Sequence, residues 1–196
     1  MIERQFPFPS ATAAIVHAFN DERHGGARPA MARLADKRLA DPPEFGGADG
    51  GAEKATAEQM LTSGLTRVQL AALRAKFAPR QRRCPCCNQQ VLREDWMAAL
   101  GVLAEAATPM VDMPSVRPPL LTALLQRHYE GSSKGLDRLA SEHGVSVSTV
   151  SRANSLLSPW LRGTRKSKGD TAPLEGIDQT AFSRAEEILR AGGFIE

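Results

Sequence analysis

Residues 125–157 constrain the fold most strongly, because they contain two short amphipathic patterns separated by a glycine. The first pattern has helical spacing, and we expect its helix to begin near Ser133. Its buried face would consist of Leu136, Leu139, Ala140 and His143. Gly144 then permits the positive φ of a tight turn, and Ser146 is a favourable N-cap for a second helix. The buried face of that helix would consist of Val147, Val150, Ala153 and Leu157.

This arrangement is typical of a helix-turn-helix, whose second helix lies in the major groove of DNA. The outward face of the second helix is short, polar and free of acidic residues, so it can approach phosphates and base edges. That face consists of Ser148, Thr149, Ser151, Arg152 and Ser155. An ordinary helical hairpin with a glycine turn is the alternative, but the spacing of small residues favours DNA binding.

Positive charge is concentrated in two segments rather than being large overall. The chain has 25 Lys and Arg residues against 22 Asp and Glu, a net charge of +3 that does not by itself predict a polyanionic partner. Residues 65–83 contain no acid and carry Arg67, Arg74, Lys76, Arg80, Arg82 and Arg83. The segment after the second helix carries Arg162, Arg165, Lys166 and Lys168. Such local patches indicate nucleic-acid contacts at particular surfaces, although a solvated linker is an equal alternative for the second segment.

A helix-turn-helix assigns roles to these side chains. Ser148, Ser151 and Arg152 would reach base edges, with arginine favouring guanine. Ser146, Thr149 and Ser155 complete the DNA-binding set. Phosphates would be neutralised by Lys134, Arg138, Arg162, Arg165 and Lys166. The basic helix within residues 67–83 would hold a second DNA segment, nascent RNA or an acidic polymerase surface, and the single arginine on the recognition face favours such a second anchor.

Three cysteines, Cys84, Cys86 and Cys87, lie within four residues. Structural zinc takes four thiolate or imidazole ligands, and Cys84 with Cys87 forms one C-x-x-C pair. No second pair exists, so a fourth ligand for Zn²⁺ must come from a carboxylate or from a distant histidine. The histidines are His17, His24, His128 and His143. A reduced, partly buried cysteine turn is the alternative, and we expect the neighbouring arginines to lower the thiol pKa.

The remaining periodicity predicts an all-α protein, a helical bundle that contains the helix-turn-helix, flexible linkers and a short cysteine-containing turn. No segment has the pattern of a β-strand. Six segments are expected: 1–40, an N-terminal helical segment; 41–62, a flexible linker; 63–114, a basic helix, cysteine turn and helix; 115–163, the helix-turn-helix module; 164–176, a basic loop; and 177–196, a C-terminal helix. The prolines of residues 107–119 favour an extended connection.

Several helix ends are marked by capping residues. Thr66 and Gln69 form a capping box for the basic helix, and Pro79 stops it. Asp178 is the expected N-cap of the last helix, Gly192 follows its end, and Phe194 folds back onto it. His143 occupies a usually apolar position and is expected to be a packed core histidine.

Several classes of function are disfavoured. The sequence contains no P-loop, dinucleotide-binding fingerprint, zinc-protease motif or hydrolase nucleophile elbow. We therefore expect that the chain is not an enzyme. No apolar run approaches the ~20 residues that span a bilayer, and residues 1–10 lack the hydrophobic core of a signal peptide. Cysteines so close together do not suit a disulfide-stapled secreted fold, which favours a reducing cytoplasm.

Residues 125–157 resemble the region-4 helix-turn-helix of bacterial sigma factors and related phage regulators. The shared features are Leu125, the pair His128-Tyr129, Gly131, the leucine–alanine helix and the Gly-Val-Ser turn before Ser148–Val150. In size and in this motif the chain is similar to phage Q-type late-gene antitermination proteins. The resemblance covers about a sixth of the chain, and the N-terminal region has no counterpart.

The resemblance implies a protein that binds a DNA element at the late promoter, loads onto a paused RNA polymerase and lets it pass terminators. Some members hold cysteine-ligated zinc, but the second C-x-x-C pair is missing here, so the resemblance does not carry zinc over to this chain. We therefore expect a sequence-specific transcription regulator, an antitermination factor acting on bacterial RNA polymerase and double-stranded DNA, without membrane contact. The alternatives are a conventional helix-turn-helix repressor or activator, and a protein–protein adaptor that docks through the cysteine turn and the arginine-rich helix.

Overall fold

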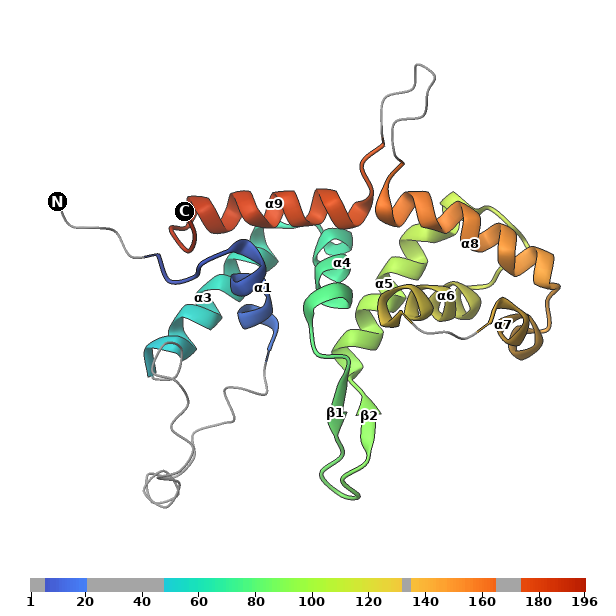
Figure 1. Cartoon of the computed structure of the whole chain (residues 1–196), viewed down its shortest axis with the longest axis horizontal. Coiled ribbons are helices and arrows are strands. Elements are labelled where there is room, and N and C mark those ends of the chain that lie inside the picture. The colour runs from blue at the N-terminus through green and yellow to red at the C-terminus, as the bar shows by residue number, and fades with distance from the viewer. Residues whose placement is uncertain (1–5, 21–47, 132–134, 165–173) are drawn as a thin grey trace. The chain divides into compact units, whose positions relative to one another are not determined.

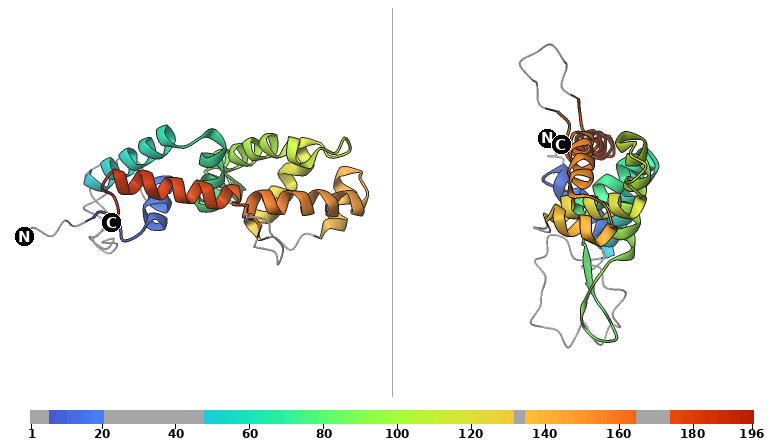
Figure 2. Two further views of the ribbon diagram at one scale, coloured as in Figure 1. Left: turned by 90° about the horizontal axis from the view of Figure 1, so that it is seen from above. Right: turned by 90° about the vertical axis from the view of Figure 1, so that its right-hand side faces the viewer.

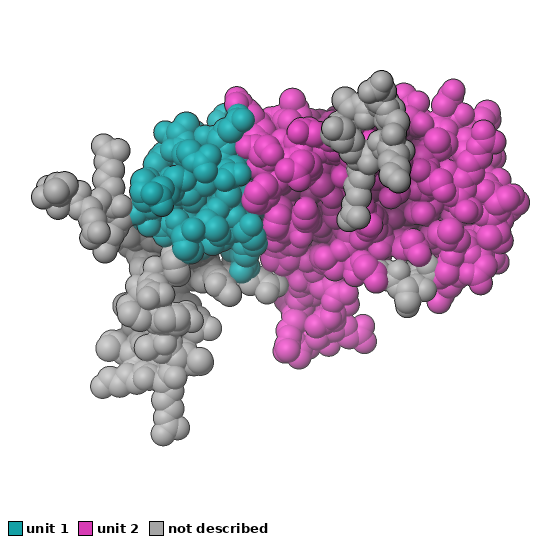
Figure 3. All heavy atoms as spheres, turned by 45° about the horizontal axis from the view of Figure 1, so that its top comes forward, with its two compact units in different colours: residues 1–64, 185–196 teal, residues 65–184 magenta. Residues whose placement is uncertain are grey.

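The computed structural model describes residues 6–20, 48–131, 135–164 and 174–196, which divide into two compact units (Figures 1 and 3). One unit contains the described residues up to Gly64 together with residues 185–196, and the other contains residues 65–184. Residues 21–40 of the expected N-terminal helical segment and most of the expected basic loop lie outside the described residues. Within the described chain, no helix is both long and apolar enough to cross a membrane.

The first unit is built on helices α1 (Ala11–Phe19) and α3 (Ala48–Gly64), which pack against each other. Ala57 and Leu61 of α3 are fully buried. The flexible linker expected over residues 41–62 is therefore wrong for residues 48–62, which belong to α3. Glycine and alanine are frequent in α3, so its sequence shows little hydrophobic periodicity. The helix is therefore stabilised by packing more than by intrinsic helix propensity.

The end of helix α9 (Ile177–Ala191) completes the first unit. Gly193 has a φ of +73°, and the N–H of Phe194 donates to the Leu189 carbonyl at 2.9 Å. This 6→1 bond satisfies a carbonyl left over at the helix end. The Phe8 N–H then donates to the Phe194 carbonyl at 3.0 Å. The predicted helix end before Gly192 and the return of Phe194 are confirmed.

The second unit is a bundle with α5 at its centre. Its helices are α4 (Arg67–Phe77), α5 (Glu94–Val111), α6 (Pro118–Glu130), α7 (Leu136–His143) and α8 (Val147–Arg162). Helix α5 packs against α4, α6 and α8. Trp96, Leu100 and Leu103 of α5 are fully buried, so the all-α bundle predicted from periodicity is confirmed. The expected extended connection begins too early, because residues 107–111 continue α5 with Ala107 and Val111 buried.

A small β-hairpin interrupts the bundle between α4 and α5. Strands β1 (Gln81–Arg83) and β2 (Gln90–Leu92) are antiparallel, with Gln81 opposite Leu92. The expectation that the chain contains no strand is wrong here. Each strand has three residues and no buried side chain, although Leu92 is half-buried, so the sequence lacks the alternation by which strands are recognised. The hairpin projects from the ends of α4 and α5 away from the other helices of its unit (Figures 1 and 2).

Candidate nucleic-acid interface

Helices α7 and α8 form the predicted helix-turn-helix. Gly144 has a φ of +65°, and the Val145 N–H donates to the Ala140 carbonyl at 3.0 Å. The left-handed conformation at Gly144 is one that residues with a Cβ rarely adopt, so the glycine is required by the turn. Leu139 and Ala140 of α7 are buried, whereas Leu136 and His143 are half-buried. His143 is therefore only partly enclosed at the end of α7.

The inner face of α8 packs against α7 and α5. Val150, Ala153 and Leu157 are buried as expected, and Leu161 continues the same face. Val147 was expected on this face, but that expectation is wrong because its side chain is 50% exposed. Val147 is the first residue of α8, so no preceding helical turn covers its side chain. The buried face of α8 begins at Val150.

The outer face of α8 carries no acidic side chain. Ser148, Ser151, Arg152 and Ser155 are exposed, and Thr149 is half-buried. The Ser146 Oγ caps the helix by accepting from the Thr149 N–H at 3.1 Å, as predicted. It also lies 2.8 Å from each of the Ser148 and Thr149 hydroxyl oxygens. Small donors and acceptors thus gather at the helix N-terminus, where the macrodipole favours negative charge.

The expected phosphate-binding residues do not all lie on this face. Arg138 of α7 pairs with Glu142, with Nε 2.8 Å from Oε1, so its charge is partly compensated. Arg162 lies ten residues after Arg152, which places it about 15 Å further along α8. Lys134, Arg165 and Lys166 lie outside the described residues.

The residues of the second basic set do not form one continuous surface. Arg67 pairs with Glu105 of α5 at 3.5 Å, and Arg82 pairs with Glu94 at 3.4 Å. Lys76 and Arg80 instead line a hollow together with Arg162 of α8. Arg74 is half-buried on α4, and Arg83 is exposed on β1. The structure thus joins members of the two basic segments that the sequence keeps separate.

That hollow has a volume of about 320 Å³ and lies between the end of α4, α6, α8 and the start of α9. Its lining residues are Lys76, Arg80, His128, Tyr129, Arg162 and Asp178. The buried Tyr129 hydroxyl donates to Asp178 Oδ1 at 2.7 Å. Burial and then the charge of Asp178 raise the pKa of Tyr129 far above its usual range. Asp178 is not the N-cap expected for the last helix, because α9 already begins at Ile177.

Sequence patterns give no sign of this hollow, because its side chains come from four distant segments. His128 Nε2 lies 3.9 Å from Asp178 Oδ2, and Arg162 Nη2 lies 3.4 Å from His128 Nδ1. His128 and Asp178 are separated by a whole helix-turn-helix in sequence. The sequence predicted only that the segments supplying Lys76, Arg80 and Arg162 are basic.

The three cysteines occupy the loop of the β-hairpin, where their Sγ atoms all lie within 4.8 Å of one another. The Cys84 and Cys86 Sγ atoms are 2.8 Å apart. Asn88 adopts a φ of +56°, and its N–H donates to the Cys84 carbonyl at 2.9 Å. This turn closes the loop and holds the thiols on one side. Among the described residues, no histidine or carboxylate joins the cluster.

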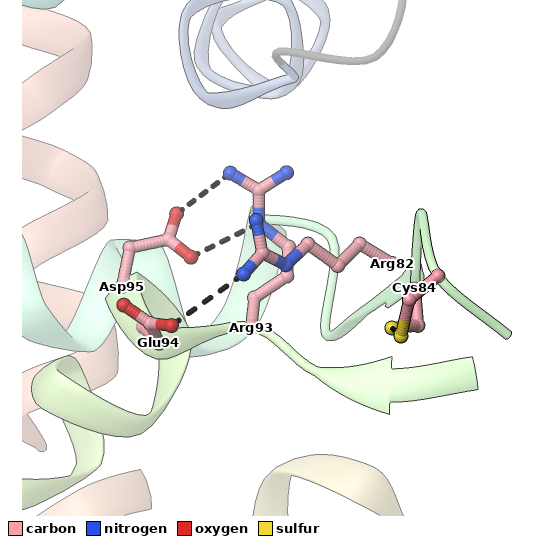
Figure 4. A network of polar contacts seen from close by, with 6 residues as sticks. Arg82, Cys84, Arg93, Glu94 and Asp95 are labelled. Carbon is pink, nitrogen blue, oxygen red and sulfur yellow. Dashed lines mark hydrogen bonds and ion pairs between the residues drawn. The ribbon is translucent and has the colours of Figure 1, made fainter. Parts of the chain in front are cut away.

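The thiol pKa values depend on contacts within this loop. The Cys86 thiol and then the backbone N–H groups of Cys86 and Cys87 lower the pKa of Cys84 to about 7. The pKa of Cys86 is raised by its thiol neighbours. Arginine charge, the expected cause, does not contribute to this shift. Arg82 instead extends to Glu94 (Figure 4).

The hairpin is joined to α5 by two ion pairs (Figure 4). Besides Arg82 with Glu94, Arg93 contacts both oxygens of Asp95, with Nε–Oδ1 at 2.9 Å and Nη2–Oδ2 at 3.0 Å. The fork of the guanidinium suits this two-point contact. These contacts lie where the hairpin meets the first turn of α5, whereas Cys86 and Cys87 in the loop are exposed.

The sequence matches no family model, and comparisons with curated proteins and with solved structures find no match. The resemblance of residues 125–157 to sigma region 4 and to Q-type antitermination proteins therefore stays a prediction.

Proposed function

We propose that this chain is a sequence-specific DNA-binding transcription regulator and that α8 is the helix that enters the major groove. The observation that carries the proposal is the contrast between the two faces of α8. Val150, Ala153 and Leu157 are buried in the bundle, whereas the opposite face is exposed, acid-free and polar apart from Leu156. If α7 and α8 were only a structural helical hairpin, α8 would need its buried face, but its exposed face would have no reason to lack acidic residues.

The exposed face has the chemistry for reading base pairs. Serine hydroxyls both donate and accept hydrogen bonds, so Ser148 and Ser151 can contact several bases. Arg152 can form a bidentate contact with guanine, a pair that contributes ~1–3 kcal/mol of discrimination. Phosphate contacts at the N-terminus of α8 would set the register of the helix in the groove.

Selection from a random duplex library with the full chain tests this proposal. A DNA-binding regulator enriches one sequence pattern short enough to be read by a single recognition helix. If no pattern is enriched above the random library, the DNA-binding proposal is wrong. The exposed side chains of Val147 and Leu156 on α8 would then favour the protein–protein adaptor.

The narrower proposal is that the regulator is an antitermination factor acting on bacterial RNA polymerase. Its support is the sigma-region-4-like pattern of residues 125–157. Transcription from a template with the selected site, a promoter-proximal pause and a downstream terminator separates the alternatives. An antitermination factor increases the fraction of transcripts that pass the terminator, whereas a conventional repressor lowers initiation and leaves that fraction unchanged.

We also propose that Cys84, Cys86 and Cys87 bind Zn²⁺ through their thiolates. Zinc–sulfur bonds of ~2.3 Å place the sulfurs of a tetrahedral site about 3.8 Å apart. Cys84 and Cys86 would have to separate by about 1 Å from their hydrogen-bonded distance, which is within the reach of exposed side chains. With three protein ligands, the fourth position would be taken by water or by a group from another molecule.

A further inference from the structure

The strongest unassigned feature is the hollow lined by Lys76, Arg80 and Arg162. We propose that it binds one phosphate of the DNA backbone, outside the groove that α8 reads. This inference rests on the proposed function, since it assumes that α8 is the recognition helix. In this proposal the same phosphate contacts Lys76 of α4, Arg80 just after α4, and Arg162 of α8.

The balance of charge in the hollow favours an anion. Three cations face one carboxylate, that of Asp178. Asp178 already accepts a hydrogen bond from Tyr129 and faces His128, and the side chains of His128 and Asp178 are only 14% and 13% exposed. Its charge is therefore largely directed into the protein. Glu130 lines an adjoining hollow, where it accepts from Gln126 at 3.0 Å.

The same contacts position one of the ligands. His128 is held between Asp178 and Arg162, and its ring packs edge-on against Tyr129 with centroids 5.0 Å apart. An imidazole that presents Nε2–H to Asp178 offers a lone pair at Nδ1 to the Arg162 guanidinium. Arg162 is thus oriented before any ligand arrives, which reduces the entropy lost on binding.

The position of the hollow identifies the source of the phosphate. Arg162 lies about 15 Å along α8 from Arg152, whereas the major groove is ~12 Å wide. With the N-terminal half of α8 at the base edges, its C-terminal end lies outside the groove, at the level of the flanking backbone. Arginine and lysine side chains are the usual phosphate ligands in such positions.

The salt dependence of DNA binding tests the inference. Full-length Arg80→Gln, Arg162→Gln and Lys76→Gln/Arg80→Gln variants are compared with Arg117→Gln, which removes one charge from an exposed position at the start of α6. Circular dichroism checks that each variant is folded. The slope of log affinity against log salt is measured on the selected duplex and on a random duplex, because backbone contacts are independent of sequence.

If the cations share one phosphate, the hollow contributes only one phosphate contact, so no combination of hollow variants lowers the magnitude of the slope by more than about one on either duplex. The double variant, which leaves only Arg162, lowers the slope by up to about one on both duplexes, and Arg117→Gln leaves it unchanged. A double variant whose slope equals that of Arg117→Gln, or a loss of about two in the double variant, would overturn the inference. Failure to select any sequence would count against the proposed function instead, and the slope on random DNA would still be measurable.

A second measurement separates backbone phosphate from free phosphate. Inorganic phosphate is added to the protein at constant ionic strength, and the midpoint of thermal unfolding is recorded. Stabilisation that depends on Arg80, together with an unaltered salt slope for DNA, would overturn the inference in favour of a small-anion site. An altered slope on DNA with weak or no stabilisation by free phosphate supports the backbone contact.

Discussion

At the scale of single residues, a buried side chain supplies a hydrogen-bond donor that the backbone at the end of α4 lacks. The carbonyl of Ala75 near the end of α4 would bond to the N–H four residues later, but that residue is Pro79, which has none. The Trp96 indole Nε1–H donates to this carbonyl at 3.0 Å. One fully buried side chain thus closes the end of α4 and anchors α5.

The substitution Trp96→Phe tests this contact. It retains most of the aromatic surface but leaves the buried Ala75 carbonyl without its donor, so we expect a loss of about 1–3 kcal/mol in the free energy of unfolding. Chemical denaturation measures it. The control is Trp160→Phe, a half-buried tryptophan on α8. Equal effects of the two substitutions would show that the indole hydrogen bond contributes nothing specific.

The ionised carboxylate of Asp95 contributes to the free energy of unfolding through its contacts with Arg93. Partial burial opposes its ionisation, but hydrogen bonds and charge from Arg93, with the Trp96 N–H, lower its pKa below the ordinary value of 3.8. A carboxyl with a lowered folded pKa stabilises the protein above its unfolded pKa, and this contribution is lost as the pH falls through the folded pKa.

We therefore expect Asp95→Asn to be less stable than the native chain at pH 7 by under about 1 kcal/mol, because the carboxylate is partly exposed and screened. The difference should shrink as the pH falls below about 3.8. Unfolding free energies between pH 7 and pH 3 check this. A difference that does not change with pH would contradict the assigned role of the Arg93–Asp95 pair.

At the scale of elements, sequence reasoning succeeded where the determining chemistry is local. The glycine turn, the Ser146 cap and the Thr66–Gln69 capping box each act within a few residues, and all three are present. The hairpin was missed because its strands have no buried face, and α3 was missed because its glycines and alanines give little periodicity. These two elements are held by partners that local patterns do not contain.

A matched pair of substitutions on α8 tests the corrected face assignment. Val147→Ser changes an exposed position and should alter the free energy of unfolding by less than about 0.5 kcal/mol. Val150→Ser places a hydroxyl in the core and removes buried apolar surface, so we expect a loss of about 2–4 kcal/mol. Similar losses at both positions, measured by denaturation, would mean that Val147 belongs to the core after all.

Metal analysis of the reduced protein tests the cysteine loop. We expect about one Zn²⁺ per chain after incubation with zinc and exchange into metal-free buffer, and little in a variant with all three cysteines replaced by serine. Cobalt substitution gives a second readout, since thiolate ligation of Co²⁺ produces strong absorption. The same low metal content in the native chain and the serine variant would rule out a metal role for the loop.

At the scale of the whole molecule, contacts between residues far apart in the sequence form features that short sequence patterns do not predict. The backbone of Phe8 bonds to that of Phe194, so both ends of the described chain belong to one unit. The hollow likewise combines Lys76, Arg80 and Arg162 from different segments. The polar outer face of α8, by contrast, lies within one helix and was predictable. Val147, which was expected on the inner face, is the exception. The expected boundary between residues 62 and 63 falls two residues from the division after Gly64.

The central claim, that α8 reads DNA sequence, is tested most directly by comparing the affinity for the selected duplex with that for a random duplex. Arg152→Ala should lower the preference for the selected duplex by ~1–3 kcal/mol, whereas Arg117→Ala should leave it unchanged. An Arg152→Ala variant that retained the full preference of the native chain would contradict the assignment of α8 as the recognition helix.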